Sequence, residues 1–336
     1  MKHSISTRRR ALLAATAGAA FLAFSASTVA QAQQYPQRPI KIVSIASAGT
    51  GIDDYTRLLA KFLGDRLGQS VVVENRPGAN MILANDYVAK SAPDGYTLLM
   101  TASSAMSANP ILYTRLPYSP SKDFVPVARM STLPIALVVS GSSPYKTVAE
   151  LVAAARAKPG AINGGSSGNG YRLMAAAFTE AAGIKTTDVP YKATSGLLPD
   201  LISGTVDYSM LEFSSALPMV QAGKLRALAV LSPKRVPLLP GVPTLSEAGV
   251  LDSGLMEAVS RTNWTGLYAP AGTPAPIVEK LAKLTQEFVT SPEAMKHYAA
   301  RGSLPNPGTG ADLTRAVQAD QQVWKRMIVV AGIQPE

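Results

Sequence analysis

Hydrophobic and polar positions along the first part of the chain predict buried strands that alternate with amphipathic helices. Residues 40–45 form an apolar run typical of a buried strand, and the small residues 46–51 follow it directly. From residue 53 to residue 67, apolar side chains such as Tyr55, Leu59 and Phe62 recur at helical spacing, and Gly68 marks the end of the helix. The same pattern continues with predicted strands at 71–74 and 96–100, a helix at 83–90 and a polar loop at 103–109. This order of elements is typical of α/β architecture.

A second block of the same kind begins near residue 135. Its predicted strands lie at 135–139, 187–191, 206–210 and 225–231, and its predicted helices at 148–158, 170–183, 197–203 and 214–222. A strand at 264–268 is followed by helices alone, which we expect to return to the first block. The chain then crosses between two lobes twice, near residues 135 and 262, and two crossover strands form a hinge. The predicted division is residues 33–135 plus 263–336 for lobe 1, and 136–262 for lobe 2.

The N-terminus has the three parts of an export signal. Lys2 and Arg8 to Arg10 are basic, residues 11–24 are apolar, and Ala30-Gln31-Ala32 matches a small-residue cleavage pattern. The apolar run of about fourteen residues is shorter than the roughly 20 needed to span a bilayer. We therefore expect residues 1–32 to be a signal peptide, cleaved near Ala32, and the mature protein to be periplasmic. Both a twin-arginine and a Sec route fit this segment.

Composition narrows the chemistry further. The chain has no cysteine and two histidines, which excludes disulfides, thiolate nucleophiles and cysteine-ligated metal sites. Loss of residues 1–32 removes four of the 32 basic residues and none of the 22 acidic ones, which leaves a net charge of +6. Lys and Arg are interleaved with Asp and Glu, so the electrostatic pattern of nucleic-acid binding is missing. We expect no nucleic-acid partner, no metal and no cofactor.

Two loops have the composition of anion sites. Residues 47–53 and 166–170 each connect a predicted strand to a helix through small residues or glycine. Such turns expose backbone N–H groups at a helix N-terminus, where unpaired donors and the helix dipole favour a negative group. Neither loop matches a nucleotide-binding motif. Glycine also serves ordinary tight turns, but one such loop in each predicted lobe favours binding.

Several segments resemble one family in order along the mature chain. They are Glu74-Asn75-Arg76-Pro77-Gly78-Ala79, Ala92-Pro93-Asp94-Gly95-Tyr96-Thr97, Gly165-Ser166-Ser167-Gly168-Asn169-Gly170, Val242-Pro243-Thr244-x-x-Glu247-Ala248-Gly249 and Ala269-Pro270-Ala271-Gly272-Thr273-Pro274. Together they resemble the Bug proteins, the extracytoplasmic binding receptors of tripartite tricarboxylate transporters. The resemblance implies a two-lobed periplasmic binding protein fold of type II-like architecture. It also implies a receptor that closes on a small carboxylate and presents it to membrane permease subunits.

The resemblance implies a set of ligand-binding residues from both lobes. From lobe 1 these are Ser47, Ala48, Gly49, Thr50, Asp53, Ser103 and Ser104, and from lobe 2 they are Ser166, Ser167, Gly168, Asn169 and Gly170. The family's first loop is usually Pro-Pro-Gly-Gly, whereas this chain has Ser47-Ala48-Gly49-Thr50, which adds two hydroxyl groups.

A second departure from the family follows Gly170, where this chain has Tyr171 and Arg172 in place of small residues and a histidine. A guanidinium can bind a second carboxylate bidentately, and a tyrosine ring can stack on an aromatic ligand. The alternative is that Arg172 faces solvent on its helix. If both side chains bind ligand, an aromatic dicarboxylate such as terephthalate is favoured; otherwise a citrate-like or C4 to C6 aliphatic acid fits.

The sequence therefore predicts a monomeric solute-binding receptor and not an enzyme. An exported serine hydrolase using Ser166 or Ser167 is the alternative from another class, but only His297 survives processing and neither serine lies in G-x-S-x-G. A receptor that signals instead of serving a permease is also open.

Overall fold

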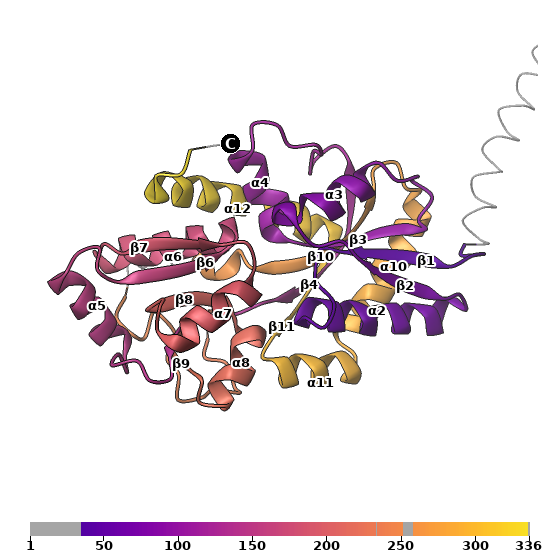
Figure 1. Ribbon diagram of the computed structural model, residues 1–336. Helices are drawn as coiled ribbons and strands as arrows, with labels where there is room; N and C mark the ends of the chain where they lie inside the picture. The colour runs from indigo at the N-terminus through magenta and orange to yellow at the C-terminus, as the bar shows by residue number, and fades with distance from the viewer. Residues whose placement is uncertain (1–34, 233, 251–257, 335–336) are drawn as a thin grey trace, which may run out of the picture.

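A computed structural model describes residues 35–232, 234–250 and 258–334. The predicted signal peptide, residues 1–32, lies outside the described residues. The chain folds into two lobes, each built on one β-sheet (Figure 1). The α/β, two-lobed prediction is confirmed.

Lobe 1 contains a mixed six-stranded sheet with the order β11-β4-β10-β3-β1-β2. Its strands are β1 (Ile40–Ser44), β2 (Val71–Asn75), β3 (Thr97–Ala102), β4 (Phe124–Thr132), β10 (Trp264–Pro270) and β11 (Leu304–Thr309). Strands β1, β2 and β3 are parallel, whereas β10 runs antiparallel to both β3 and β4. One face is covered by α2 (Gly51–Leu67), α10 (Ala275–Val289) and α11 (Pro292–Arg301). The other is covered by η1 (Ala79–Met81), α3 (Ile82–Ala89), η2 (Ser104–Ala108) and the start of α12 (Gly310–Ala331), whereas α4 (Asn109–Leu112) follows η2 and packs through Leu112 in the core of lobe 2.

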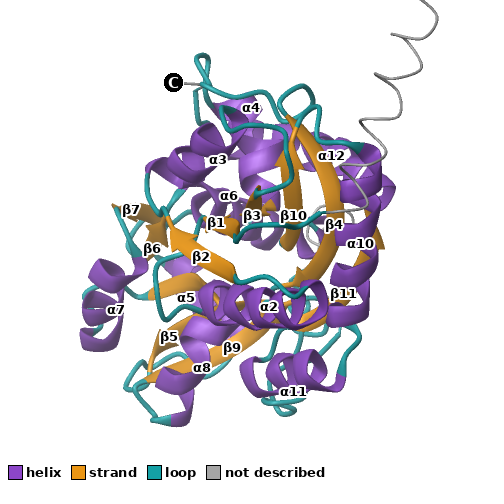
Figure 2. Ribbon diagram, turned by 90° about the vertical axis from the view of Figure 1, so that its right-hand side faces the viewer, coloured by secondary structure: helices purple, strands orange, loops and turns teal. Residues whose placement is uncertain are grey.

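Lobe 2 contains a five-stranded sheet with the order β7-β6-β8-β5-β9. Its strands are β5 (Ile135–Ser140), β6 (Asn163–Ser167), β7 (Thr187–Tyr191), β8 (Tyr208–Glu212) and β9 (Leu225–Leu231). Helices lie on both faces (Figure 2): α5 (Val148–Ala157) and α6 (Asn169–Ala182) on one, and α7 (Thr194–Ser203) and α8 (Phe213–Gln221) on the other. Gly164 and Gly165 serve packing within β6, because a Cβ at these positions would lie 2.6 Å from the Tyr208 ring and 2.3 Å from Leu197.

The two strand crossings between the lobes lie side by side. The chain leaves β4 through Leu133 and Pro134 into β5, and it returns through Asn263 into β10. The Leu133 amide donates to the Asn263 carbonyl at 2.8 Å, and the Asn263 side-chain amide donates to the Leu133 carbonyl at 2.5 Å. Paired, short connections of this kind are the geometry of a hinge.

Helix α12 adds a third link that the sequence-based division into lobes did not include. Its first turns pack in lobe 1 through Leu313, whereas Trp324, Met327 and Ile328 belong to the hydrophobic core of lobe 2. In Figure 1 its yellow ribbon extends from lobe 1 toward α6. The proposed boundaries near residues 135 and 262 follow the strands, but this helix is shared by both lobes. Within the described ranges, no helix combines the length and apolar character that a membrane crossing requires.

Candidate functional site

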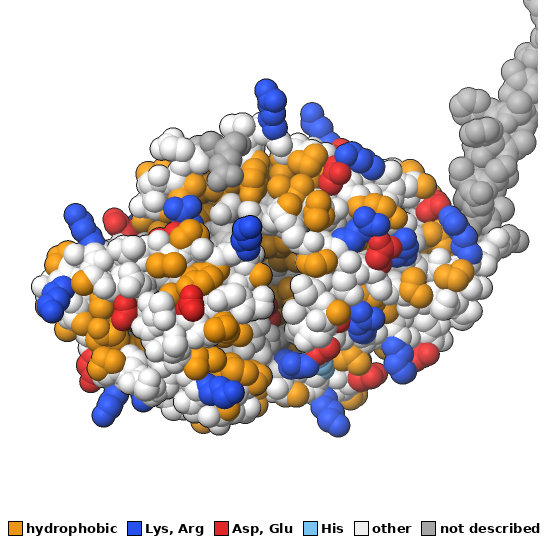
Figure 3. Space-filling model, in the orientation of Figure 1, with side chains coloured by type: hydrophobic (Ala, Val, Ile, Leu, Met, Phe, Trp, Pro, Cys, Tyr) orange, Lys and Arg blue, Asp and Glu red, His pale blue; other side chains and the backbone are white. Residues whose placement is uncertain are grey.

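The carboxyl ends of four strands, two from each sheet, meet where the lobes face each other, and a helical segment begins at each of them. In lobe 1 these segments are α2 after β1 and η2 after β3; in lobe 2 they are α6 after β6 and α8 after β8. A Cβ at Gly51, the first residue of α2, would lie 2.8 Å from the Ser214 Oγ of α8. A Cβ at Gly170 in α6 would lie 3.7 Å from the Ser104 Cβ of η2. The start of α2 thus lies against α8 and the start of α6 lies against η2, both across the face between the lobes, and Figure 3 shows the crease between the two halves of the molecule.

The loop after β1 is held in shape by Asp53. Its carboxylate accepts hydrogen bonds from the Gly49 amide at 2.9 Å, from Arg57 Nε at 3.0 Å and from Asn75 Nδ2 at 2.7 Å. Burial opposes ionisation of Asp53, but these three hydrogen bonds and the Arg57 charge outweigh it, so the pKa of Asp53 is lowered. Asp53 is buried and both of its carboxylate oxygens accept hydrogen bonds, so it shapes the loop.

The other predicted residues of this loop are exposed. Ser47, Ala48, Gly49 and Thr50 line the surface, and Gly49 has a φ of 80°, a conformation that favours glycine. Thr50 caps α2 by accepting a hydrogen bond from the Asp53 amide, and its hydroxyl donates to the Ser47 carbonyl at 2.8 Å. The Gly49 amide is taken by Asp53. Among the described residues, the amides of Gly51 and Ile52 have no acceptor and are the open donors of this terminus.

The loop after β6 presents donors in the same way. Gly168 has a φ of 98°, and α6 begins there without a side-chain cap. The first amide of α6 bonded back into its own turn is that of Arg172, which donates to the Gly168 carbonyl at 3.2 Å. Within the described chain, the amides of residues 169–171 are therefore left without an acceptor. Unpaired amides at a helix N-terminus are the arrangement that favours an anion.

The serines assigned to the site differ in their surroundings. The Ser166 hydroxyl donates to Asp188 at 2.7 Å, and Ser167 pairs with the Thr194 hydroxyl at 3.0 Å. Ser103 is buried and donates to the Thr262 carbonyl near the hinge. Ser104 lies beside the second loop, with its Cβ 3.7 Å from the Cβ position of Gly170.

The structure gives Arg172 a partner other than a ligand. Its Nε lies 2.8 Å from Asp188 Oδ2, and its side chain borders a cavity of about 180 Å³ with residues of β7 and the end of α12. Tyr171 packs against the core of lobe 2, where burial first and the Glu212 charge second raise its pKa. These positions do not support the two contacts that favoured an aromatic dicarboxylate, namely Arg172 with a second carboxylate and Tyr171 stacked on the ligand ring.

The sequence analysis missed a strained segment at the same interlobe face. Ala79, Asn80 and Met81 have φ values of 47°, 48° and 72°, in the left-handed region that residues other than glycine rarely adopt. Asn80 Nδ2 donates to the Tyr113 hydroxyl at 2.5 Å, and Asn169 Nδ2 donates to the same hydroxyl at 3.3 Å. Tyr113 therefore joins the strained segment of lobe 1 to the second loop. Strain of this kind is retained where the backbone is used for function.

Glu212 also lies in this face and was not assigned to the site. It precedes α8, its carboxylate accepts a hydrogen bond from Ser214, and Oε1 lies 3.4 Å from the Cβ position of Gly51. Desolvation by burial raises the pKa of Glu212, and the Ser214 hydrogen bond offsets this only in part. An acid with a raised pKa beside an anion site reduces the repulsion that a fixed carboxylate would exert.

His297 lies apart from the serines of lobe 2. Its ring stacks on Tyr55 of α2 in lobe 1 with centroids 6.0 Å apart, and burial and the Arg301 charge lower its pKa. Within the described residues, no cluster of acidic or imidazole side chains has the composition of a metal site.

Residues 55–333 match the model of the family described as the tripartite tricarboxylate transporter family receptor. The chain belongs to this family. Bordetella pertussis BugT is 34% identical over 307 residues, which is 90% of this chain and 91% of BugT. Among solved structures, R. palustris Rpa4515 with adipate has 33% identity and a TM-score of 0.82, and it covers 90% of this chain and 100% of its own. MatC from Rhodopseudomonas palustris with bound malate has 29% identity and a TM-score of 0.76, covering 88% of this chain and 100% of its own.

These similarities confirm the resemblance to the Bug receptors and the two-lobed fold. They cover nearly all of the described chain. The site can therefore be considered as that of a solute-binding receptor of this family.

Proposed function

We propose that the protein is a periplasmic receptor that binds a small aliphatic dicarboxylate between its lobes and delivers it to the permease of a tripartite tricarboxylate transporter. The observation that carries the proposal is the presence of one open helix N-terminus in each lobe, each in contact with the other lobe. The amides of Gly51 and Ile52 come from one side and those of residues 169–171 from the other. Each end favours a negative group through its donors and its dipole.

Main-chain donors are sufficient in strength for this role. Charge-assisted hydrogen bonds contribute about 1.5 to 3 kcal/mol each, and a helix terminus contributes up to about 2 kcal/mol. Together they reach the roughly 8 kcal/mol of micromolar binding after ordering costs. A guanidinium is not required, which agrees with the pairing of Arg172 and Asp188.

A C4 to C6 aliphatic acid is favoured over an aromatic one. The aromatic proposal depended on Arg172 and Tyr171, and these side chains are engaged by Asp188 and by the lobe 2 core. The relatives named above carry adipate and malate in their structures, which supports an aliphatic ligand for this chain as well.

Isothermal titration calorimetry of the mature protein tests the binding step. Adipate, succinate, malate, citrate and terephthalate are titrated separately. We expect micromolar affinity for at least one C4 to C6 aliphatic dicarboxylate and weaker binding of terephthalate. Failure of every carboxylate to bind at millimolar concentration would reject the receptor proposal.

The transport step needs a test in cells. We expect deletion of the permease subunits to abolish growth on the bound acid while leaving binding by the purified receptor intact. Normal growth without the permease would indicate a signalling receptor instead. Among the described residues, no serine hydrogen-bonds to a histidine in support of the hydrolase alternative, and turnover of a p-nitrophenyl ester that is lost in Ser166→Ala would revive it.

A further inference from the structure

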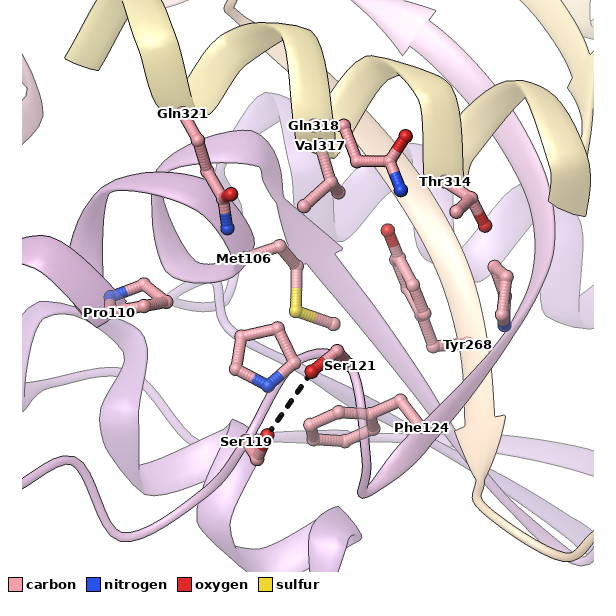
Figure 4. Close-up of a pocket in the computed structure, with 12 residues that line it drawn as sticks. Met106, Pro110, Ser119, Ser121, Phe124, Tyr268, Thr314, Val317, Gln318 and Gln321 are labelled. Atoms are coloured by element: carbon pink, nitrogen blue, oxygen red, sulfur yellow. Dashed lines mark hydrogen bonds between the residues drawn. The ribbon is translucent and has the colours of Figure 1, made fainter. Parts of the chain in front are cut away.

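We propose that lobe 1 carries a second binding pocket, for a small uncharged molecule with an apolar body and one hydrogen-bonding group. A cavity of about 410 Å³ lies between the outer face of the sheet and α12 (Figure 4). Its walls come from η2, from the loop before β4, from β10 and from α12. It is separate from the interlobe site, because its lining residues come from lobe 1 and from residues 314–321 of α12, and none belongs to the strands or other helices of lobe 2.

The cavity has the size and lining of a small-molecule site. Pockets of about 300 to 1,000 Å³ with apolar walls and a few polar groups are typical of such sites. Here Met106, Phe124 and Val317 supply apolar surface, whereas Gln318 and Gln321 of α12 supply neutral polar groups.

A buried hydroxyl without a partner marks where the ligand's polar group would bind. Tyr268 is 3% exposed, and its hydroxyl has no hydrogen-bond partner within the described part of the chain. Figure 4 shows this hydroxyl directed toward the α12 side of the cavity. Buried polar groups are usually hydrogen-bonded, so an unsatisfied one at a cavity calls for an explanation. A ligand hydroxyl or carbonyl would provide it.

The walls are fixed before any ligand binds. The rings of Phe124 and Tyr268 meet edge to face with centroids 6.3 Å apart, and Tyr118 packs on Phe124 in the same way at 5.9 Å. The Tyr118 hydroxyl donates to the Ala105 carbonyl at 2.7 Å, and the Ser119 amide donates to Asp123 at 2.6 Å. A pocket held by such contacts loses little conformational freedom on binding.

The electrostatics select an uncharged ligand. No lysine, arginine, histidine, aspartate or glutamate is among the residues that line the cavity. Asp320, on α12, interacts electrostatically with Tyr268, and the Trp264 indole donates to it at 2.7 Å. An anion would therefore meet no basic side chain in the cavity lining and would lie near the Asp320 carboxyl group, which disfavours the acids proposed for the interlobe site.

Methionine-methyl NMR of the mature protein tests the proposal with benzyl alcohol as probe. The Met106 methyl, assigned through Met106→Leu, should shift saturably with benzyl alcohol and with toluene, but not with benzoate, and adipate should not compete. Tyr268→Phe keeps the ring and removes the hydroxyl. It should weaken benzyl alcohol about three- to tenfold and leave toluene unchanged. Val317→Trp, which fills the cavity, should abolish both.

Three results would overturn the proposal. They are no saturable shift of the Met106 methyl up to the solubility of benzyl alcohol, equal effects of Tyr268→Phe on both probes, or benzoate binding as tightly as benzyl alcohol. Far-UV circular dichroism verifies folding of each variant. If Val317→Trp fails to fold, Tyr268→Phe with the two probes still decides.

Discussion

Gly51→Ala should weaken ligand binding without lowering the stability of the folded protein. Gly51 is the first residue of α2, and its backbone lies outside the left-handed region, so alanine fits the local conformation. In the described arrangement its Cβ would lie 2.8 Å from Ser214 Oγ and 3.3 Å from Ser214 Cβ. The new methyl group therefore opposes the contact between α2 and α8.

The expected size follows from this overlap. Overpacking by one methyl group costs about 1 to 3 kcal/mol. We expect a bound ligand to keep α2 against α8, so that this cost falls mainly on the bound state. Ligand affinity should therefore fall about 5- to 150-fold by calorimetry with the preferred dicarboxylate. The midpoint of urea unfolding should not decrease, because replacement of glycine at a compatible position reduces the entropy of the unfolded chain.

Gly170→Ala is the matched control. It adds the same methyl group to the start of α6, where the nearest atoms, those of Ser104, lie at an ordinary contact distance of 3.7 to 3.9 Å. We expect its affinity to stay within about twofold of the wild type. Ser214→Ala in the Gly51→Ala background removes the 2.8 Å contact and should restore part of the affinity. Equal affinities for wild type and Gly51→Ala, or no rescue by Ser214→Ala, would refute the assignment of this contact to the bound state.

Further substitutions test individual side chains. Asp53→Asn should lower the free energy of unfolding by about 1 to 3 kcal/mol at pH 7. Because the pKa of Asp53 is lowered in the folded protein, the difference in unfolding free energy between wild type and variant should shrink as the pH falls below about 4. A difference that stays constant with pH would contradict the role of the ionised carboxylate. The raised pKa of Glu212 favours its protonated form in the folded state, so its stabilisation is complete below about pH 4.3 and is lost as the pH rises through the folded pKa. Ionised Glu212 should also repel the dicarboxylate, so wild-type affinity should fall as the pH rises. Glu212→Gln should remove both pH dependences, that of the unfolding free energy and that of the affinity. Unchanged pH profiles in urea unfolding and calorimetry would refute this. Tyr268→Phe should raise the free energy of unfolding by about 1 kcal/mol in urea titrations, since it removes an unsatisfied buried hydroxyl, and a destabilised variant would contradict the absence of a partner. Arg172→Ala should leave adipate affinity within about twofold and cost less than about 1 kcal/mol of stability, because it loses a half-exposed ion pair; a large loss of affinity would return Arg172 to the site.

The sequence predicted the elements whose patterns are local. The first strand and the helix after it were recognised because an apolar run precedes side chains at helical spacing. The helix begins at Gly51, two residues before the predicted start, since Thr50 serves as its N-cap. Strands β4, β6 and β11 were not given as strands. β6 consists of small polar residues and glycine, and prolines interrupt β4 and β11; β11 tolerates Pro305 and Pro307 because it is an edge strand paired with β4 alone.

The candidate site could be predicted from the sequence at its glycine-rich turns, but not where it depends on contacts distant in sequence. The left-handed segment 79–81 and the bridge through Tyr113 have no periodic signal, because partners 33 and 56 residues away fix them. For Arg172 the sequence left a ligand contact and a solvent-facing position open. It could not predict the ion pair with Asp188 of β7, because Asp188 reaches Arg172 only after the sheet forms. Asp53 was assigned to the right loop, but as a contact and not as the residue that shapes it.

The central claim is that backbone amides of two opposed helix termini bind one dicarboxylate. A ¹⁵N–¹H NMR titration of the mature protein with adipate, or with the tightest acid from calorimetry, tests it directly. We predict that the largest saturable shifts occur at the amides of Gly51 and Ile52 and at those of residues 169–171, with the same dissociation constant for both groups. Saturable shifts confined to one lobe, or largest around Arg172 and Asp188 with these amides unmoved, would contradict the account.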